Sequence, residues 1–284
     1  MAVWGSGYIA TKIGLQYAAP FTFLTLRYVF GLLCLFPIVL LFRPNWPKSG
    51  KEYGHLVAAG VLMHAVQLGG SHYAQYLGMS AGVTALIISS QPLVTAFAVS
   101  YFFREKIYPG QWLGVFIGLA GVALVVWHKI DIREVTWGSL LGTLIALAGV
   151  TAATLYQRTF AARTDLKAAA VVQFAASLLV LAPLAVVFED FKVDFTYQLL
   201  ASIAFLVIFA SILGVSVLHL LMRRGEATRV TSMMYLPPVF AVVLEGALFG
   251  VVPSALSFAG MAITCAGVAM TVWKGGRRSS ISSR

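Results

Sequence analysis

Long apolar runs, separated by short charged or Gly/Pro-containing stretches, constrain this chain more than any other feature. Hydrophobic residues fill 60% of its 284 positions and charged residues only 11%, whereas soluble domains carry roughly a quarter charged residues. Because a spanning helix needs about 20 apolar residues, the chain has room for about ten spans and no soluble domain. The runs predict helices over residues 3–18, 21–42, 54–77, 80–103, 110–127, 137–160, 167–188, 197–222, 226–249 and 254–273.

The distribution of basic residues predicts how these helices are oriented. The net charge of +10 would suit a nucleic acid, but the cations lie in short clusters between apolar runs and at the tail. Short loops rich in Lys and Arg stay in the cytoplasm, so both termini are expected there. The cations on this side are Arg43, Lys48, Lys51, Arg104, Lys106, Arg158, Arg163, Lys167, Arg223, Arg224, Arg229, Lys274, Arg277, Arg278 and Arg284. We therefore expect a lipid bilayer, and no nucleic acid, as the partner.

An internal repeat emerges when the second half is shifted back by 146 residues. The shift pairs Pro37 with Pro183 and Pro92 with Pro238 without a gap. Each half holds five predicted helices, and an odd number makes the second half enter the membrane upside down relative to the first.

The loop charges support this inversion independently. The basic stretch 43–51 aligns with the acidic stretch 189–197, so equivalent loops lie on opposite sides of the membrane. We predict an all-α integral membrane protein with ten transmembrane helices in two inverted five-helix repeats. The first repeat would cover residues 1–130, the second 131–276, and a cytoplasmic tail 277–284.

Two proline-containing breaks interrupt equivalent apolar runs, one in each half. They are Ser89-Ser90-Gln91-Pro92 and Tyr235-Leu236-Pro237-Pro238. Proline leaves a carbonyl without its donor, which is tolerated in a membrane only where protein or water satisfies it. Such breaks mark binding sites in transporters, so Pro92, Pro237 and Pro238 are the candidates for kinks or gates.

Polar and aromatic side chains near these breaks are the candidate lining of a cavity. Polar side chains in hydrocarbon usually face the bundle interior or water, although interhelical hydrogen bonds are an alternative role for each of them. The predicted cavity residues are His72, Tyr73, Tyr76, Ser89, Ser90, Gln91, Tyr156, His219 and Tyr235.

Three charged residues fall within predicted helices. Lys12 and Arg27 flank the same short outer turn, where they either attract a carboxylate or tie helices together, and the structural role is favoured. Glu245 lies well inside an apolar run. It either takes up a proton or cation, or pairs with a basic neighbour.

No pattern indicates a metal site or cofactor. Cys34 and Cys265 lie in apolar runs without ligand spacing, and His64 and His72 are eight residues apart with no acid on their face. A membrane-embedded enzyme would need a compact catalytic constellation, which the sequence does not contain. A passive channel would not need symmetric proline breaks. No G-x-x-x-x-G-K loop for ATP is present.

Several motifs together resemble the EamA-type transporters of the drug/metabolite transporter superfamily, and within it the YddG-type amino acid exporters. The motifs are Trp4-Gly5-Ser6, Lys12, Arg27 after Pro20, Pro92 followed by Arg104-Glu105, and the glycines Gly114 and Gly121. The resemblance implies a secondary transporter that moves a small metabolite by alternating access through a central cavity. One departure is that the family's acid at the end of the ninth helix would fall at Val251, whereas this chain carries Glu245 further inside.

A cavity lined by aromatic side chains and few fixed charges would suit an amino acid with an aromatic or apolar side chain better than a phosphorylated sugar. The expected function is therefore export of such amino acids, with a drug, nucleoside or other metabolite facilitator as the alternative. The expected setting is a multi-pass plasma membrane protein, in the bacterial inner membrane, acting as a monomer or homodimer on a small-molecule substrate.

Overall fold

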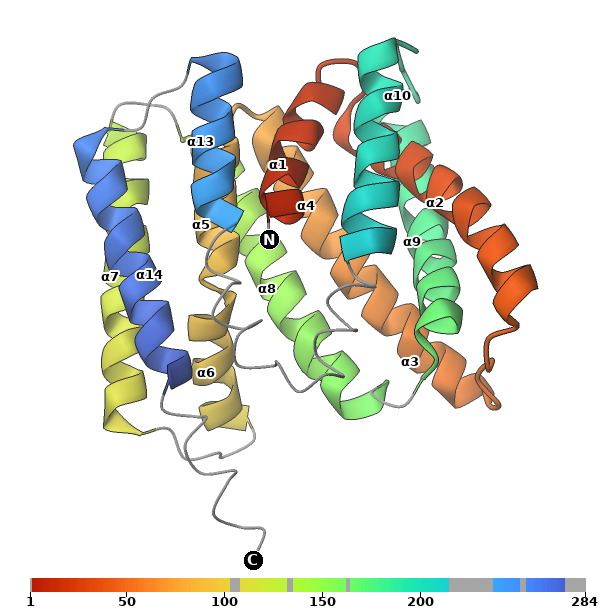
Figure 1. Ribbon diagram of the computed structural model, residues 1–284, viewed down its shortest axis with the longest axis horizontal. Helices are drawn as coiled ribbons and strands as arrows, with labels where there is room; N and C mark the ends of the chain where they lie inside the picture. Colours follow the sequence, from red (N-terminus) through yellow and green to blue (C-terminus); the bar gives the residue numbers. More distant parts are fainter. Residues whose placement is uncertain are drawn as a thin grey trace, which may run out of the picture. The chain divides into compact units, whose positions relative to one another are not determined.

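A computed structural model of the chain describes residues 2–102, 108–131, 135–161, 164–214, 237–250 and 254–273. In these residues the structure is almost entirely helical (Figure 1). The helices are α1 (Ala2–Gly14), α2 (Pro20–Phe42), α3 (Gly50–Gly60), η1 (Val61–Val66), α4 (Gln67–Tyr76), α5 (Ala81–Ser89), α6 (Gln91–Phe102), α7 (Pro109–Asp131), α8 (Trp137–Phe160), α9 (Leu166–Glu189), α10 (Tyr197–Ala204), η2 (Phe205–Leu213), α13 (Pro237–Phe249) and α14 (Ala255–Trp273). The predicted cavity residues His219 and Tyr235 lie outside the described ranges.

Among the described residues, four segments are long and apolar enough to cross a membrane: Pro20–Phe42, Ala81–Ala98, Trp137–Phe160 and Leu166–Glu189. Large apolar side chains on α2 and α9 remain exposed, including Leu41 and Phe188 at 77% and 72%. Exposed apolar surface of this extent is expected where lipid covers the helices.

Two compact units form within the chain, and each takes helices from both halves of the sequence. The first unit comprises residues 1–9, 78–137 and 213–284, and the second comprises 10–77 and 138–212. In the first unit α7 and α14 lie side by side (Figure 1), and a Cβ on Gly121 would meet the Thr264 nitrogen at 2.6 Å. Small residues at this contact let the two helix backbones approach closely.

The core of the second unit is built around the pair α2 and α9. Leu24, Tyr28, Phe174 and Leu181 are buried together in it. Both helices continue through an internal proline, Pro37 in α2 and Pro183 in α9.

Helix boundaries recur along the chain. Helices begin at residues 20, 50, 91 and 109, and again 146 or 147 residues later at 166, 197, 237 and 255. The π-helical segments also correspond, since η1 covers 61–66 and η2 covers 205–213.

The predicted helix over 80–103 is divided at Ser90 into α5 and α6. The Ser90 hydroxyl donates to the Ile87 carbonyl at 2.6 Å, and the Ser90 carbonyl accepts from the Leu93 N–H at 2.9 Å. Pro92 then lies in the first turn of α6. A backbone N–H in the first turn has no acceptor within its own helix, so the proline costs no hydrogen bond there. The polar stretch before Pro92 therefore provides the local hydrogen bonds that the break requires.

Candidate functional site

The start of α2 is held by a carboxylate from the end of α9. Ala19 precedes the helix and offers no side-chain cap, and Pro20 occupies the first turn. Glu189 accepts hydrogen bonds from the N–H groups of Phe21 and Thr22 at 2.9 and 2.7 Å, and from the Thr22 hydroxyl at 2.8 Å. A negative charge at this position also suits the positive end of the helix dipole.

The opposite end of the same helix pair carries a second acidic contact. Asp165 caps α9 by accepting the Lys167 N–H at 2.9 Å, and it also accepts the Asn45 N–H beyond the end of α2 at 3.3 Å. Partial burial alone would raise the pKa of Asp165, but these N–H donors outweigh it and the pKa lies below its usual value. Acids of the second half thus tie both ends of the antiparallel α2–α9 pair.

The chain leaving α9 folds back over the turn between α1 and α2. Asp190 and Phe191 both adopt φ near 51°, a left-handed conformation that reverses the chain direction. The Asp194 N–H donates to the Tyr17 carbonyl at 2.8 Å, and Val193 forms an isolated antiparallel bridge with Ala18. These contacts fix the rim of a pocket.

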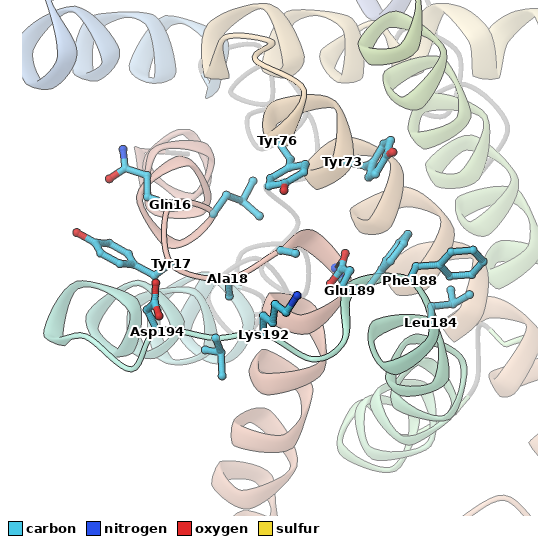
Figure 2. Close-up of a pocket in the computed structure, with 14 residues that line it drawn as sticks. Gln16, Tyr17, Ala18, Tyr73, Tyr76, Leu184, Phe188, Glu189, Lys192 and Asp194 are labelled. Atoms are coloured by element: carbon cyan, nitrogen blue, oxygen red, sulfur yellow. Dashed lines mark hydrogen bonds between the residues drawn. The ribbon is translucent and has the colours of Figure 1, made fainter.

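The pocket has a volume of about 760 Å³ and lies entirely within the second unit (Figure 2). Its aromatic lining residues are Tyr17, Phe21, Tyr73, Tyr76 and Phe188. Its charged lining residues are Glu189, Lys192 and Asp194, and the others include Gln16 and Leu184.

One side of the pocket is formed by aromatic rings. Phe21 stacks on Tyr73 with centroids 6.2 Å apart and planes 11° apart, and Tyr73 lies 6.4 Å from Tyr76. Figure 2 shows the two tyrosines on one side and Lys192 and Asp194 on the other. A ligand in this pocket would lie between aromatic faces and charged groups.

More acidic than basic side chains line the pocket. Two carboxylates and one ammonium line it, and the Lys192 ammonium already lies 3.2 Å from Asp190. Aromatic faces also attract cations. The arrangement therefore suits a ligand that carries an ammonium group and an apolar or aromatic body.

Tyr73 and Tyr76 are the predicted cavity residues that line this pocket. His72 does not line it, because its ring is buried between Phe23, at 5.8 Å, and Thr11, whose hydroxyl is 3.4 Å from Nε2. Tyr156 also lies elsewhere in the second unit, where its hydroxyl is 2.8 Å from Nδ1 of His55.

The remaining predicted residues that the structure describes belong to the first unit or to helix interiors. Ser89, Ser90, Gln91 and Pro92 surround the break between α5 and α6, and Pro237 and Pro238 begin α13. Lys12 is half-buried in α1.

The two most buried of the predicted intramembrane charges bond to neutral groups. Glu245 is only 2% exposed and accepts the N–H groups of Ala81 and Gly82 at 3.1 and 2.9 Å. Arg27 is 9% exposed and donates from Nη2 to the Ser211 hydroxyl at 3.2 Å.

Sequence reasoning missed the charged part of the pocket. Glu189, Lys192 and Asp194 were used only as a topology signal, because acidic loops between spans are common on the outer side. The signal that could have found Glu189 is the capless start Ala19-Pro20, which requires an acceptor from another part of the chain.

Comparisons with known proteins identify the chain's relatives. The model of the EamA-like transporter family matches residues 1–127 and 136–273. An uncharacterized inner membrane transporter, YedA, of Escherichia coli is 24% identical over 87% of this chain and 80% of its own length. A probable amino-acid metabolite efflux pump of Salmonella typhimurium is 23% identical over 96% of this chain and 92% of its own.

A protein of known crystal structure has a similar fold. It is 17% identical, covers 97% of this chain and 95% of its own, and superposes with a TM-score of 0.64. At this identity the likeness concerns the fold alone.

Proposed function

This chain belongs to the EamA-like transporter family, and we propose that it is a secondary transporter that exports amino acids with aromatic or apolar side chains. The observation that carries the proposal is the pocket of the second unit, which combines aromatic walls with two carboxylates and one ammonium. An α-amino acid offers an ammonium to these carboxylates and an apolar side chain to the rings. A sugar phosphate or nucleotide would require several cations instead.

The recurring helix boundaries support an inverted repeat as the basis of alternating access. Spans that start at 20, 50, 91 and 109 have counterparts at 166, 197, 237 and 255. With five helices per half, the second would have the opposite orientation. In this proposal the cationic clusters put both termini in the cytoplasm, and the pocket would open to the outer side of the bacterial inner membrane.

Relatives support the substrate class to a limited extent. One of them is described as a probable amino-acid metabolite efflux pump, and its match extends over nearly this whole chain. The pocket adds a physical reason why this chain would accept an amino acid.

Counterflow in proteoliposomes tests the proposal. Vesicles are loaded with unlabelled phenylalanine, leucine, a nucleoside, a cationic drug or a sugar phosphate, and the entry of the matching labelled compound is measured. We expect exchange of phenylalanine and leucine, reduced at least tenfold by Tyr73→Ala and by Asp194→Asn. The control is Tyr197→Ala, which removes an 83% exposed tyrosine outside the pocket. Exchange confined to nucleosides, drugs or sugar phosphates would contradict the proposal.

A further inference from the structure

We propose that Arg27, with Ser211 beside it, forms an intramembrane subsite for the carboxylate of the transported amino acid. Both residues belong to the second unit, Arg27 on α2 and Ser211 on the π-helix η2. This inference rests on the proposed function and concerns a second site, because Arg27 does not line the outer pocket.

The hydrogen bonding of Arg27 is incomplete. A guanidinium carries five N–H donors, but the bond from Nη2 to the Ser211 hydroxyl is a neutral contact at 3.2 Å, and Nε is buried without a partner. Among the described residues, the side-chain ion pairs are Lys167–Asp165 and Lys192–Asp190, and neither involves Arg27. Within the part of the chain that the structure describes, the positive charge of Arg27 is therefore buried without an ion-pair partner.

The surroundings of Arg27 are neutral or basic. The adjacent Tyr28 packs edge-on against His64, with ring centroids 5.5 Å apart. A buried charge without a partner is unfavourable, so an anion that binds beside Arg27 would relieve that cost.

Further unpartnered polar atoms lie on the same turn of α2. The Thr25 and Tyr28 hydroxyls are buried and have no hydrogen-bond partner, so three side chains within four residues have unmet hydrogen-bonding capacity. Buried polar groups in folded proteins nearly all find partners, and exceptions point to a missing ligand or water.

Two π-helical segments flank this turn, η2 through Ser211 and η1 through His64. A π-helix changes the register of side chains within a helix and recurs at functional sites. A carboxylate is the chemical class that fits best, because it accepts two parallel N–H bonds from a guanidinium. Arg27 does not line the outer pocket, and the ammonium and carboxylate of an α-amino acid are attached to the same carbon. The subsite would therefore hold the carboxylate at a second position on the transport path, after the substrate has left the outer pocket.

Ligand binding to the purified full chain in detergent tests this subsite. The probes are 3-phenylpropanoate, which has a carboxylate and no ammonium, and its neutral amide. We expect the acid to raise the unfolding temperature of the wild type and to bind at least tenfold more tightly than the amide. Arg27→Gln should abolish that preference and Arg27→Lys should retain part of it. Val29→Ala, at a lipid-exposed position on the same helix, should keep it.

Equal binding of acid and amide to the wild type would overturn the inference even if Arg27→Gln fails to fold. An unchanged preference in a folded Arg27→Gln variant would overturn it as well. Failure of the proposed function has a different signature, since the wild type would then exchange no amino acid in counterflow and still prefer the acid over the amide.

Discussion

Two helices, one in each compact unit, begin with the same arrangement but in different surroundings. At the start of α2, Glu189 accepts the N–H groups of Phe21 and Thr22. At the start of α5, Glu245 accepts those of Ala81 and Gly82. In both cases a glutamate from the second half of the sequence caps a helix of the first half.

The difference lies in exposure and in local support. Glu245 is 2% exposed and works beside Ser80, whose hydroxyl caps Val83. Glu189 is half-buried, lines the pocket of the second unit, and has no local cap beside it. Water can replace a lost bond at α2 but not at α5. The comparison therefore separates a cap that lies inside the fold from a cap that also lines the pocket.

The largest effect is expected from Glu245→Ala. Removing the carboxylate leaves two N–H groups unsatisfied in a buried location, which should cost about 3 kcal/mol in the free energy of unfolding. Thermal unfolding in detergent, followed by tryptophan fluorescence, measures the loss. Glu245→Gln retains one acceptor oxygen and should therefore lose less stability than Glu245→Ala. Equal stability of Glu245→Ala and the wild type would show that the buried cap does not contribute.

A smaller effect is expected from Gly82→Ala. A Cβ at this position would meet Val242 Cγ2 at 2.5 Å and the Glu245 carboxylate at 3.5 Å, so the Val242 side chain or α13 itself would have to shift. Overpacking of this kind should cost about 2 kcal/mol. Gly54→Ala is the matched control, because nothing lies within 4 Å of a Cβ there, and it should stabilise α3 by about 0.5 to 1 kcal/mol. If Gly82→Ala and Gly54→Ala changed the free energy of unfolding equally, the close approach of α5 and α13 at Gly82 would be refuted.

The smallest loss of stability is expected from Glu189→Ala. Loss of a helix cap at an accessible position costs about 1 kcal/mol, and water can take over part of the hydrogen bonding. The same substitution should weaken phenylalanine exchange much more than Glu245→Gln does, because it removes one of two pocket carboxylates. A stability loss as large as that of Glu245→Ala, with unchanged exchange, would reverse the assignment of the two caps.

Local sequence rules predicted much of the helical architecture. Apolar runs predicted the positions of the spans. Which helices pack closely was not predicted, and the structure shows that α7 packs on α14 through Gly121 and Gly267. The break before Pro92 was predicted as a kink. In the structure the Ser90 hydroxyl donates a hydrogen bond to the Ile87 carbonyl at this break.

The candidate site was predicted only in part. Tyr73 and Tyr76 were identified from their polar groups in an apolar run, but helical periodicity does not tell which neighbouring helix a side chain meets. Glu189 and Glu245 bond to backbone N–H groups more than 160 residues away in the sequence. Contacts of that range depend on how helices pack, which no local pattern encodes.

Efflux from living cells tests the central claim most directly. Cells that produce the chain are loaded with labelled phenylalanine, and its initial rate of exit is compared with that of cells producing the Asp194→Asn variant at equal membrane abundance. The account predicts faster exit with the wild-type chain and a return to the background rate with the variant. Exit at the background rate in both, or faster exit of a sugar phosphate instead of phenylalanine, would contradict it.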